Sequence, residues 1–251
     1  MLRVANLALA YTGEPVLEDT SFHVAAGSFA SLVGPSGSGK SSILRAIAGL
    51  HKPLSGKISI AVGPGDIGFL FQDDALLPWR TARENVALGL RLRGMSRGAA
   101  LDEAESWLGR LGLDGLGGRY PSRLSGGQRK RVALAQVFAL RPKFLLMDEP
   151  FAALDAIVRL NITQELLGWV EREHVTVLLV THDLEEALTV SDDVHVLSRG
   201  PRAQIRASYK VPIPRPRDLL GCRGHPSFTP LLERLWHDLS AEIGGPTRKV
   251  A

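Results

Sequence analysis

Residues 29–50 read FASLVGPSGSGKSSILRAIAGL, which is a short apolar run, a loop rich in glycine and serine, and a helix-forming segment. The loop matches G-x-x-x-x-G-K-S, a pattern that wraps backbone N–H groups around phosphates at a helix N-terminus. The apolar run predicts a buried strand directly before it. This context indicates a phosphate loop and nucleotide binding, and the alternative is a Gly-Ser-rich turn with a solvent-facing lysine.

The residues of this loop are the first candidate site. Lys40 is expected to reach the β- and γ-phosphates of the nucleotide, and the Ser41 hydroxyl is expected to bind Mg²⁺. The predicted phosphate-binding set is Gly34, Pro35, Ser36, Gly37, Ser38, Gly39, Lys40, Ser41 and Ser42.

Strands and helices are predicted to alternate on both sides of this stretch. Apolar runs of strand length occur at 3–11, 21–24, 29–33, 57–60, 68–71, 143–147, 176–180 and 194–198. Such alternation favours a sheet with crossover helices. A chain of 251 residues is long enough to bury a sizeable core around that sheet.

The middle of the chain has a different pattern. Between 81 and 140 no strand is predicted, and ARENVALGLRL, AALDEAESWLGRLG and GQRKRVALAQVFAL carry apolar residues at helical spacing. This predicts a helical subdomain over about 81–140, inserted into a core over about 1–80 and 141–210. A Pro- and Gly-rich segment and the amphipathic LLERLWHDLSAEI predict a C-terminal extension over about 211–251.

Polar side chains follow three of the predicted strands. KFLLMDEP at 143–150 ends a strand in Asp148 and Glu149, at the edge where parallel sheets bind nucleotides. Beside a phosphate loop, this favours Asp148 as support for Mg²⁺ and Glu149 as the group that polarises the attacking water. Read alone, such a pair more often begins a solvated loop. His182 is a candidate γ-phosphate contact rather than a capping residue, and Gln72 is a candidate ligand of Mg²⁺ or its water.

A second glycine-rich segment, LSGGQRKR at 124–131, directly precedes an apolar helical pattern. Ser125 is expected to cap this helix, and the glycines leave room for an anion close to the backbone. A chain with a phosphate loop has no evident need of another anion site. The segment therefore raises the question of which phosphate it binds.

The bulk composition is that of an ordinary globular protein, with 45% hydrophobic residues, 22% charged residues and a formal net charge of +4. The cations are scattered apart from RKR and PRPR, so no nucleic-acid partner is expected. Cys222 is the single cysteine, which excludes an internal disulfide and indicates a reducing compartment. We expect no signal peptide and no membrane-spanning helix, because no apolar run approaches about 18–20 residues.

The phosphate loop, the strand-terminal Gln72, LSGGQ, MDEP, ALDA and THD occur in the order and approximate spacing of the ATP-binding cassette (ABC) ATPases, which the chain resembles over about 2–205. The resemblance implies an α/β fold with a RecA-like P-loop NTPase core, an antiparallel β-subdomain and an inserted helical subdomain. It implies ATP and Mg²⁺ as cofactors. It also implies catalytic roles for Glu149, His182 and Gln72, with Ser41, Gln72 and Asp148 at the metal.

The same resemblance implies a head-to-tail homodimer in which the LSGGQ signature of each subunit faces the ATP of the other. The signature residues expected at that ATP are Ser125, Gly126, Gly127 and Gln128. Leu154 and Asp155 match the loop that crosses the dimer interface. Ala152 and Ala153 stand where the family often has a serine, and we expect little consequence because Asp155 is retained.

Two further resemblances concern the base and the membrane partner. Tyr11 matches the family's aromatic that stacks on adenine, and Val16 is expected beside it. DALLPWRTARENVALGL, FAALDA and VLSRGP are similar to the ATPases of bacterial importers for nitrate, aliphatic sulfonates and taurine. This similarity implies that a membrane permease docks on a surface formed by Leu76, Leu77, Pro78 and Trp79.

An importer of this kind implies an extracytoplasmic solute-binding protein as an indirect partner and a place at the cytoplasmic face of the bacterial inner membrane. The alternative is an ABC ATPase without a transport pathway that acts on nucleic acid or a protein complex. Such relatives commonly carry paired cassettes or a long coiled-coil insertion, whereas this chain has one cassette and a short helical subdomain. The sequence therefore favours the importer.

Overall fold

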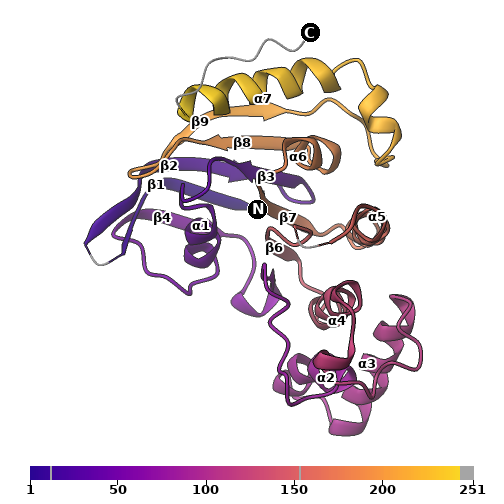
Figure 1. The fold of residues 1–251 in the computed structure, drawn as a ribbon. Coiled ribbons are helices and arrows are strands. Elements are labelled where there is room, and N and C mark those ends of the chain that lie inside the picture. Colours follow the sequence, from indigo (N-terminus) through magenta and orange to yellow (C-terminus); the bar gives the residue numbers. More distant parts are fainter. Residues whose placement is uncertain (12, 153, 244–251) are drawn as a thin grey trace.

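Two β-sheets lie side by side in the computed structural model, which describes residues 1–11, 13–152 and 154–243 (Figure 1). The smaller sheet is antiparallel, in the order β2-β1-β4, and the larger sheet has the order β5-β6-β7-β3-β8-β9. The strands are β1 (Leu2–Tyr11), β2 (Glu14–Val24), β3 (Phe29–Val33), β4 (Ser55–Ile60), β5 (Ile67–Leu70), β6 (Phe144–Asp148), β7 (Thr176–Thr181), β8 (Asp193–Leu197) and β9 (Ile205–Lys210).

The central strands of the larger sheet are covered on both faces. Every residue of β3, β6 and β7 is buried, and neighbouring strands from β5 to β8 are parallel. A parallel strand buried on both faces is expected to be a nearly continuous apolar run, as FASLV and FLLM are. Because parallel strands end together, the residues after β3, β5, β6 and β7 lie at one edge of the sheet.

The helices that cover the two faces of this sheet form separate hydrophobic clusters with it. The helix α1 (Lys40–Ile47) packs with the smaller sheet on one face, and α5 (Ala156–Arg172) packs on the other. Near β8 the core continues into α6 (Leu184–Val190) and α7 (Phe228–Ile243), so part of the C-terminal extension belongs to the folded body. Within the described ranges, no helix combines the length and apolarity needed to cross a bilayer.

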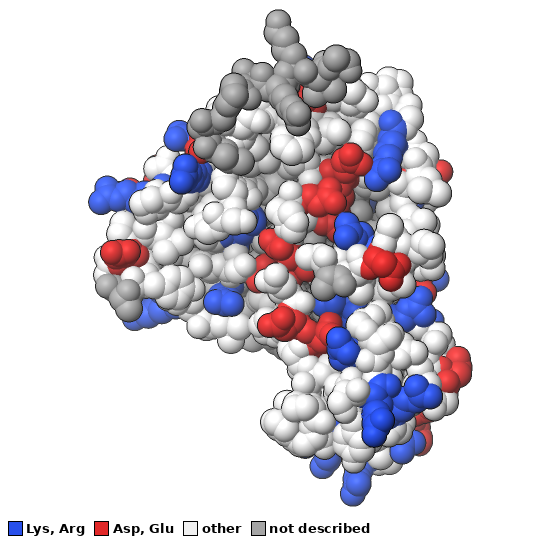
Figure 2. Space-filling view, in the orientation of Figure 1, with Lys and Arg blue, Asp and Glu red and all other residues white. Residues whose placement is uncertain are grey.

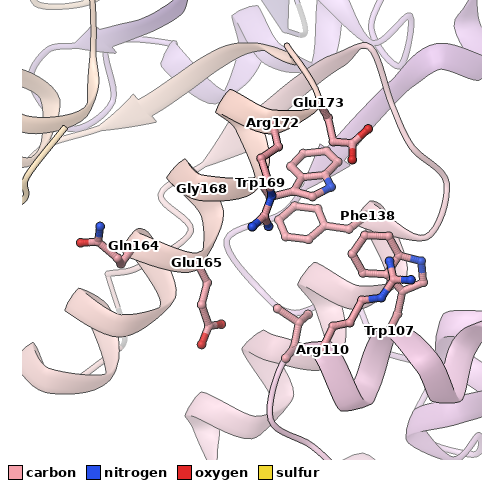
Figure 3. A pocket seen from close by; sticks show the side chains of 10 residues that line it. Trp107, Arg110, Phe138, Gln164, Glu165, Gly168, Trp169, Arg172 and Glu173 are labelled. Carbon is pink, nitrogen blue, oxygen red and sulfur yellow. The ribbon is translucent and has the colours of Figure 1, made fainter. Parts of the chain in front are cut away.

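Three helices gather at the lower end of Figure 1, away from the sheets: α2 (Ala82–Leu92), α3 (Arg97–Arg110) and α4 (Gly126–Phe138). They form the helical lobe. At its junction with α5, Phe138 stacks on Trp169 with ring centroids 4.0 Å apart, and Trp107 meets the edge of Phe138. Figure 3 shows these rings at a cavity of about 560 Å³ between the lobe and α5.

Some strand boundaries differ from the sequence prediction. The strand β9 was not predicted, because it is a short edge strand of alternating exposure with the sequence IRASYK. The strand β2 begins at Glu14, well before the predicted 21, because its first half, EPVLED, contains a proline and does not alternate between apolar and polar residues. Edge strands of this kind carry too little apolar periodicity to be recognised from sequence.

Candidate functional site

The phosphate loop connects β3 to α1 and is shaped by its glycines. Gly39 caps α1 with a φ of +90°, a conformation that a side chain rarely adopts. A Cβ at Gly39 would lie 2.7 Å from Val16 Cγ1, so β2 packs directly against the loop. The Ser38 hydroxyl is buried and has no hydrogen-bond partner among the described residues, as expected of a loop that binds a polar ligand.

Lys40 lies inside this loop. The side chain is 6% exposed, and its Nζ donates to the carbonyl oxygens of Gly34 and Pro35, each at 2.9 Å. Burial lowers the pKa of this ammonium, whereas the negative charges of Glu149 and Asp148 raise it. The result is a desolvated cation that can exchange two carbonyl contacts for phosphate oxygens.

Ser41 and Asp148 bring two oxygen ligands together at the same edge. Ser41 Oγ donates to Asp148 Oδ1 at 2.8 Å, and Asp148 is 5% exposed. Burial raises the pKa of Asp148, the Ser41 hydrogen bond lowers it, and the neighbouring Glu149 charge raises it. One carboxylate and one hydroxyl suit Mg²⁺, which usually takes few protein ligands and completes its shell with phosphates and water. These side chains fit that ion.

Glu149 follows in an unusual backbone conformation. Its φ is +42°, and its backbone N–H donates to the Val180 carbonyl at 2.9 Å. Its Oε2 lies 3.0 Å from Nδ1 of His182, which follows the adjacent strand β7. The structure therefore brings the two predicted catalytic residues into contact.

Gln72 and Tyr11 also lie near the ends of strands. Gln72 follows β5, whose Leu70 pairs with Met147 beside Asp148, so it leaves the sheet at the same edge. Tyr11 ends β1, is 38% exposed and packs against His51 with ring centroids 4.5 Å apart. His51 was not predicted, because nothing in its local sequence distinguishes it from a surface residue.

The signature segment begins α4 with a capping box. Gln128 N donates to Ser125 Oγ at 3.3 Å, and Ser125 N donates to Gln128 Oε1 at 3.0 Å. Within the described ranges, no hydrogen bond or ion pair joins 125–128 to the phosphate loop at 34–42. Both Ser125 and Gly126 are exposed.

The two signature glycines are not equivalent. Among the described residues, a Cβ at Gly126 would meet only Arg129 Nη2, at 3.8 Å, whereas a Cβ at Gly127 would lie 2.9 Å from Val158 Cγ1 of α5. From the sequence, both glycines were expected for the same purpose, which is to leave room for phosphate. The structure gives Gly127 a reason within its own chain, the packing of α4 against α5.

The segment after Glu149 has a capping role in addition to the predicted one. Asp155 Oδ1 accepts from Val158 N at 3.0 Å and caps α5, and the Leu154 carbonyl accepts from Arg159 Nη2 at 3.2 Å. Ala153 lies outside the described residues. These contacts fix the start of α5 beside the strand that carries the acidic pair.

The predicted docking surface is only partly exposed. Trp79 is 70% exposed and Pro78 is exposed, whereas Leu76 and Leu77 are partly buried and Leu76 packs on the core. Asn85, fully buried in α2, holds this loop: its Oδ1 accepts from Leu77 N at 2.7 Å, and its Nδ2 donates to the Leu77 carbonyl at 3.2 Å. The role of Asn85 was not predicted, although a polar residue at an apolar position of the helical pattern ARENVALGL could have indicated it.

Comparisons with known proteins agree with this geometry. A family model described as ABC transporter matches residues 17–152. Aliphatic sulfonates import ATP-binding protein SsuB 1 of Paracoccus denitrificans is 41% identical over 95% of this chain and 93% of that protein. Sulfate/thiosulfate import ATP-binding protein CysA of Nocardia farcinica is 44% identical over 82% of this chain. The chain spans 64% of that longer relative.

Among solved structures, the fold resembles a dimeric post-hydrolysis state of the ATP-binding cassette MJ0796 bound to ADP and Pi. The TM-score is 0.75 at 31% sequence identity, and the match covers 84% of this chain and 99% of the other. This agreement extends to the whole of the solved cassette.

Proposed function

The chain belongs to the ABC transporter family of ATP-binding proteins, and on that premise we propose that it hydrolyses ATP as a homodimer to power the import of a small solute through a separate membrane permease. One observation carries the proposal. The phosphate loop, the Ser41–Asp148 pair and the Glu149–His182 pair converge at the ends of neighbouring strands of one sheet.

In the proposed ground state, the loop N–H groups and Lys40 bind the triphosphate. Ser41 and Asp148, with Gln72 beside them, would hold Mg²⁺, which when bound would neutralise charge on the β- and γ-phosphates. Tyr11 and Val16 would flank the adenine, and the partial exposure of the Tyr11 ring, which lies tilted against His51, supports this assignment.

Glu149 is the proposed general base. Its carboxylate would accept a proton from the water that attacks the γ-phosphorus, as the P–O bond to ADP breaks. His182 shares a contact with this carboxylate through Nδ1, which would hold Glu149 in place and leave Nε2 for a γ-phosphate oxygen. The burial of Asp148 and Lys40 supports this site, because charges in a low-dielectric site act strongly on phosphate.

The second anion site is proposed to serve the partner subunit. The exposed Ser125 and Gly126 at the start of α4 would face the γ-phosphate bound by the other chain. Leu154 and Asp155 would lie at the interface between subunits. Loss of the γ-phosphate would then weaken the dimer, since a ligand that contacts both subunits shifts the equilibrium between open and closed forms.

The partners follow from the same proposal. Trp79 and Pro78 would dock a permease at the cytoplasmic face of the inner membrane, and an extracytoplasmic protein would deliver the solute. The solute class proposed is nitrate, sulfonate or taurine, in line with the sulfonate importer relative. Figure 2 shows acidic and basic side chains interspersed on one face, which favours this proposal over nucleic-acid binding.

The test is ATP hydrolysis by the chain co-expressed with candidate permease proteins from its own source organism. We expect the two to co-purify, and we expect a binding protein loaded with taurine, another sulfonate or nitrate to stimulate phosphate release. Glu149→Gln should slow turnover on the order of 10²-fold or more and leave ATP binding intact. A wild-type complex that binds no ATP, or an assembled complex that hydrolyses none, would contradict the proposal.

A further inference from the structure

A series of polar contacts, with the buried Lys130 at its centre, joins the loop after β5 to the beginning of α4. Lys130 is 4% exposed, and its Nζ lies 3.0 Å from Asp74 Oδ1. The same ammonium donates to the carbonyl oxygens of Gln72 at 3.2 Å and of Phe71 at 3.5 Å. An ammonium buried in this way is tolerated only when it is paired and hydrogen-bonded. The Lys130 side chain therefore fixes the loop that carries Gln72 to α4.

Arg129 extends these contacts to the signature. Its Nε lies 3.4 Å from Asp74 Oδ2, and its Nη1 donates to the Leu124 carbonyl at 2.8 Å. Leu124 is buried and directly precedes Ser125. The contacts thus run without interruption from the backbone of Gln72, through two cations and Asp74, to the residue before the helix cap.

These contacts lie where the chain passes between the core and the helical lobe. The loop after β5 enters the lobe, and α4 leads from the lobe back to β6. The lobe is also supported by the apolar stack of Phe138 on Trp169, at the C-terminal end of α4 (Figure 3). The aromatic stack holds the C-terminal end of α4, whereas the ion pair with its hydrogen bonds fixes the N-terminal end of the helix relative to one particular loop.

We propose that Asp74, Lys130 and Arg129 are positioning residues that couple the Gln72 loop to the signature. This inference rests on the proposed head-to-tail dimer, in which Gln72 faces the chain's own ATP and Ser125 faces the partner's. Occupancy of one ATP site then sets the placement of the signature at the other. A contiguous set of ion pairs and hydrogen bonds can carry coupling of this kind, and these contacts provide one.

The test compares Asp74→Asn, Lys130→Met and the double variant with wild type. None of these side chains touches the phosphate loop, so MgATP affinity of the monomer should stay within about 2-fold. ATP-dependent dimerisation, measured by light scattering in a Glu149→Gln background, and kcat with Glu149 retained should each fall on the order of 10-fold. The double variant should be no worse than Lys130→Met, because the residues act as one unit.

The matched control is Lys143→Met, which removes an exposed ammonium that lies 3.5 Å from Asp66 and should change neither measurement. Folded variants with wild-type kcat and dimerisation would overturn the inference. Losses of kcat and dimerisation that run in parallel with losses of ATP affinity and melting temperature would also overturn it. The inference would fail as well if the effects of Asp74→Asn and Lys130→Met simply added in the double variant. If Lys130→Met does not fold, Asp74→Asn carries the test with the same outcomes. A wild-type chain that neither dimerises with ATP nor hydrolyses it would contradict the proposed function instead.

Discussion

The two glycine-rich loops of this chain differ in what surrounds them. At the phosphate loop, Lys40 is buried by its own loop, and Ser41 is hydrogen-bonded to Asp148 within the same sheet edge. At the signature, Ser125 and Gln128 cap each other, and among the described residues a Cβ at Gly126 would meet only the end of the Arg129 side chain. The first loop belongs to a site assembled within one chain. The second is a rigid helix start whose exposed face is available to another chain.

The largest effect should come from Lys40→Ala. This change removes an ammonium that donates up to three charge-assisted hydrogen bonds, so the isolated chain should lose MgATP affinity on the order of 100-fold. Isothermal titration calorimetry measures this affinity. Ser125→Ala should leave the same affinity unchanged if the signature plays no part in its own chain's site. Equal losses in the two variants would remove the contrast between the loops.

A smaller effect concerns Glu186, which lines the same small cavity as Glu149 and His182 at the start of α6. Its pKa is raised from 4.5 to about 7, mainly by burial. The Asp183 charge also raises this pKa, and a hydrogen bond from Thr181 lowers it. Because the folded pKa lies above the unfolded one, this carboxyl contributes stability that is complete below about pH 4.5 and is lost as the pH rises through about 7.

The side chain at position 186 cannot titrate in the Glu186→Gln variant. Between pH 5 and pH 8.5, the free energy of unfolding of this variant should therefore rise on the order of 2 kcal/mol relative to that of wild type. Urea unfolding at the two pH values measures this difference. Glu185→Gln, which makes the same change at an exposed neighbour, is the control. An identical pH dependence in Glu186→Gln and wild type would show that this edge of the sheet is more open to water than the structure describes.

The smallest effect on stability should come from Ser125→Ala. Loss of the cap should cost about 1 kcal/mol, seen as a lower melting temperature. Ser96 caps α3 in the same way, with Oγ accepting from Ala99 N at 3.3 Å, so Ser96→Ala should cost a similar amount. Only Ser125→Ala should also impair ATP-dependent dimerisation. If both variants impair dimerisation equally, Ser125 acts through helix stability alone.

The sequence predicted one of these regions better than the other. The phosphate loop and the Asp148–Glu149 pair are local patterns next to buried apolar strands, so their positions at a sheet edge followed directly. The contact of Lys130 with the Gln72 loop joins segments that are far apart in the chain, and no local pattern marks it. The packing of Gly127 on Val158 was hidden for the same reason.

The most direct test of the central claim, that the signature completes the partner's site, mixes two damaged chains. One carries Lys40→Ala and the other Gly126→Asp, each with Glu149→Gln so that bound ATP is not consumed. Gly126 is the position to change, because a side chain at Gly127 would meet Val158 of its own chain. A carboxylate at 126 would face phosphate, a like-charge contact in a poorly solvated interface.

Each homodimer then has both sites damaged, whereas the heterodimer has both lesions in one site and an intact second site. If the signature acts on the partner, mixing should restore ATP-dependent dimerisation with about one occluded ATP per heterodimer. If the signature serves its own chain, both chains remain damaged in any mixture. A confirmed heterodimer that occludes no ATP would therefore contradict the account.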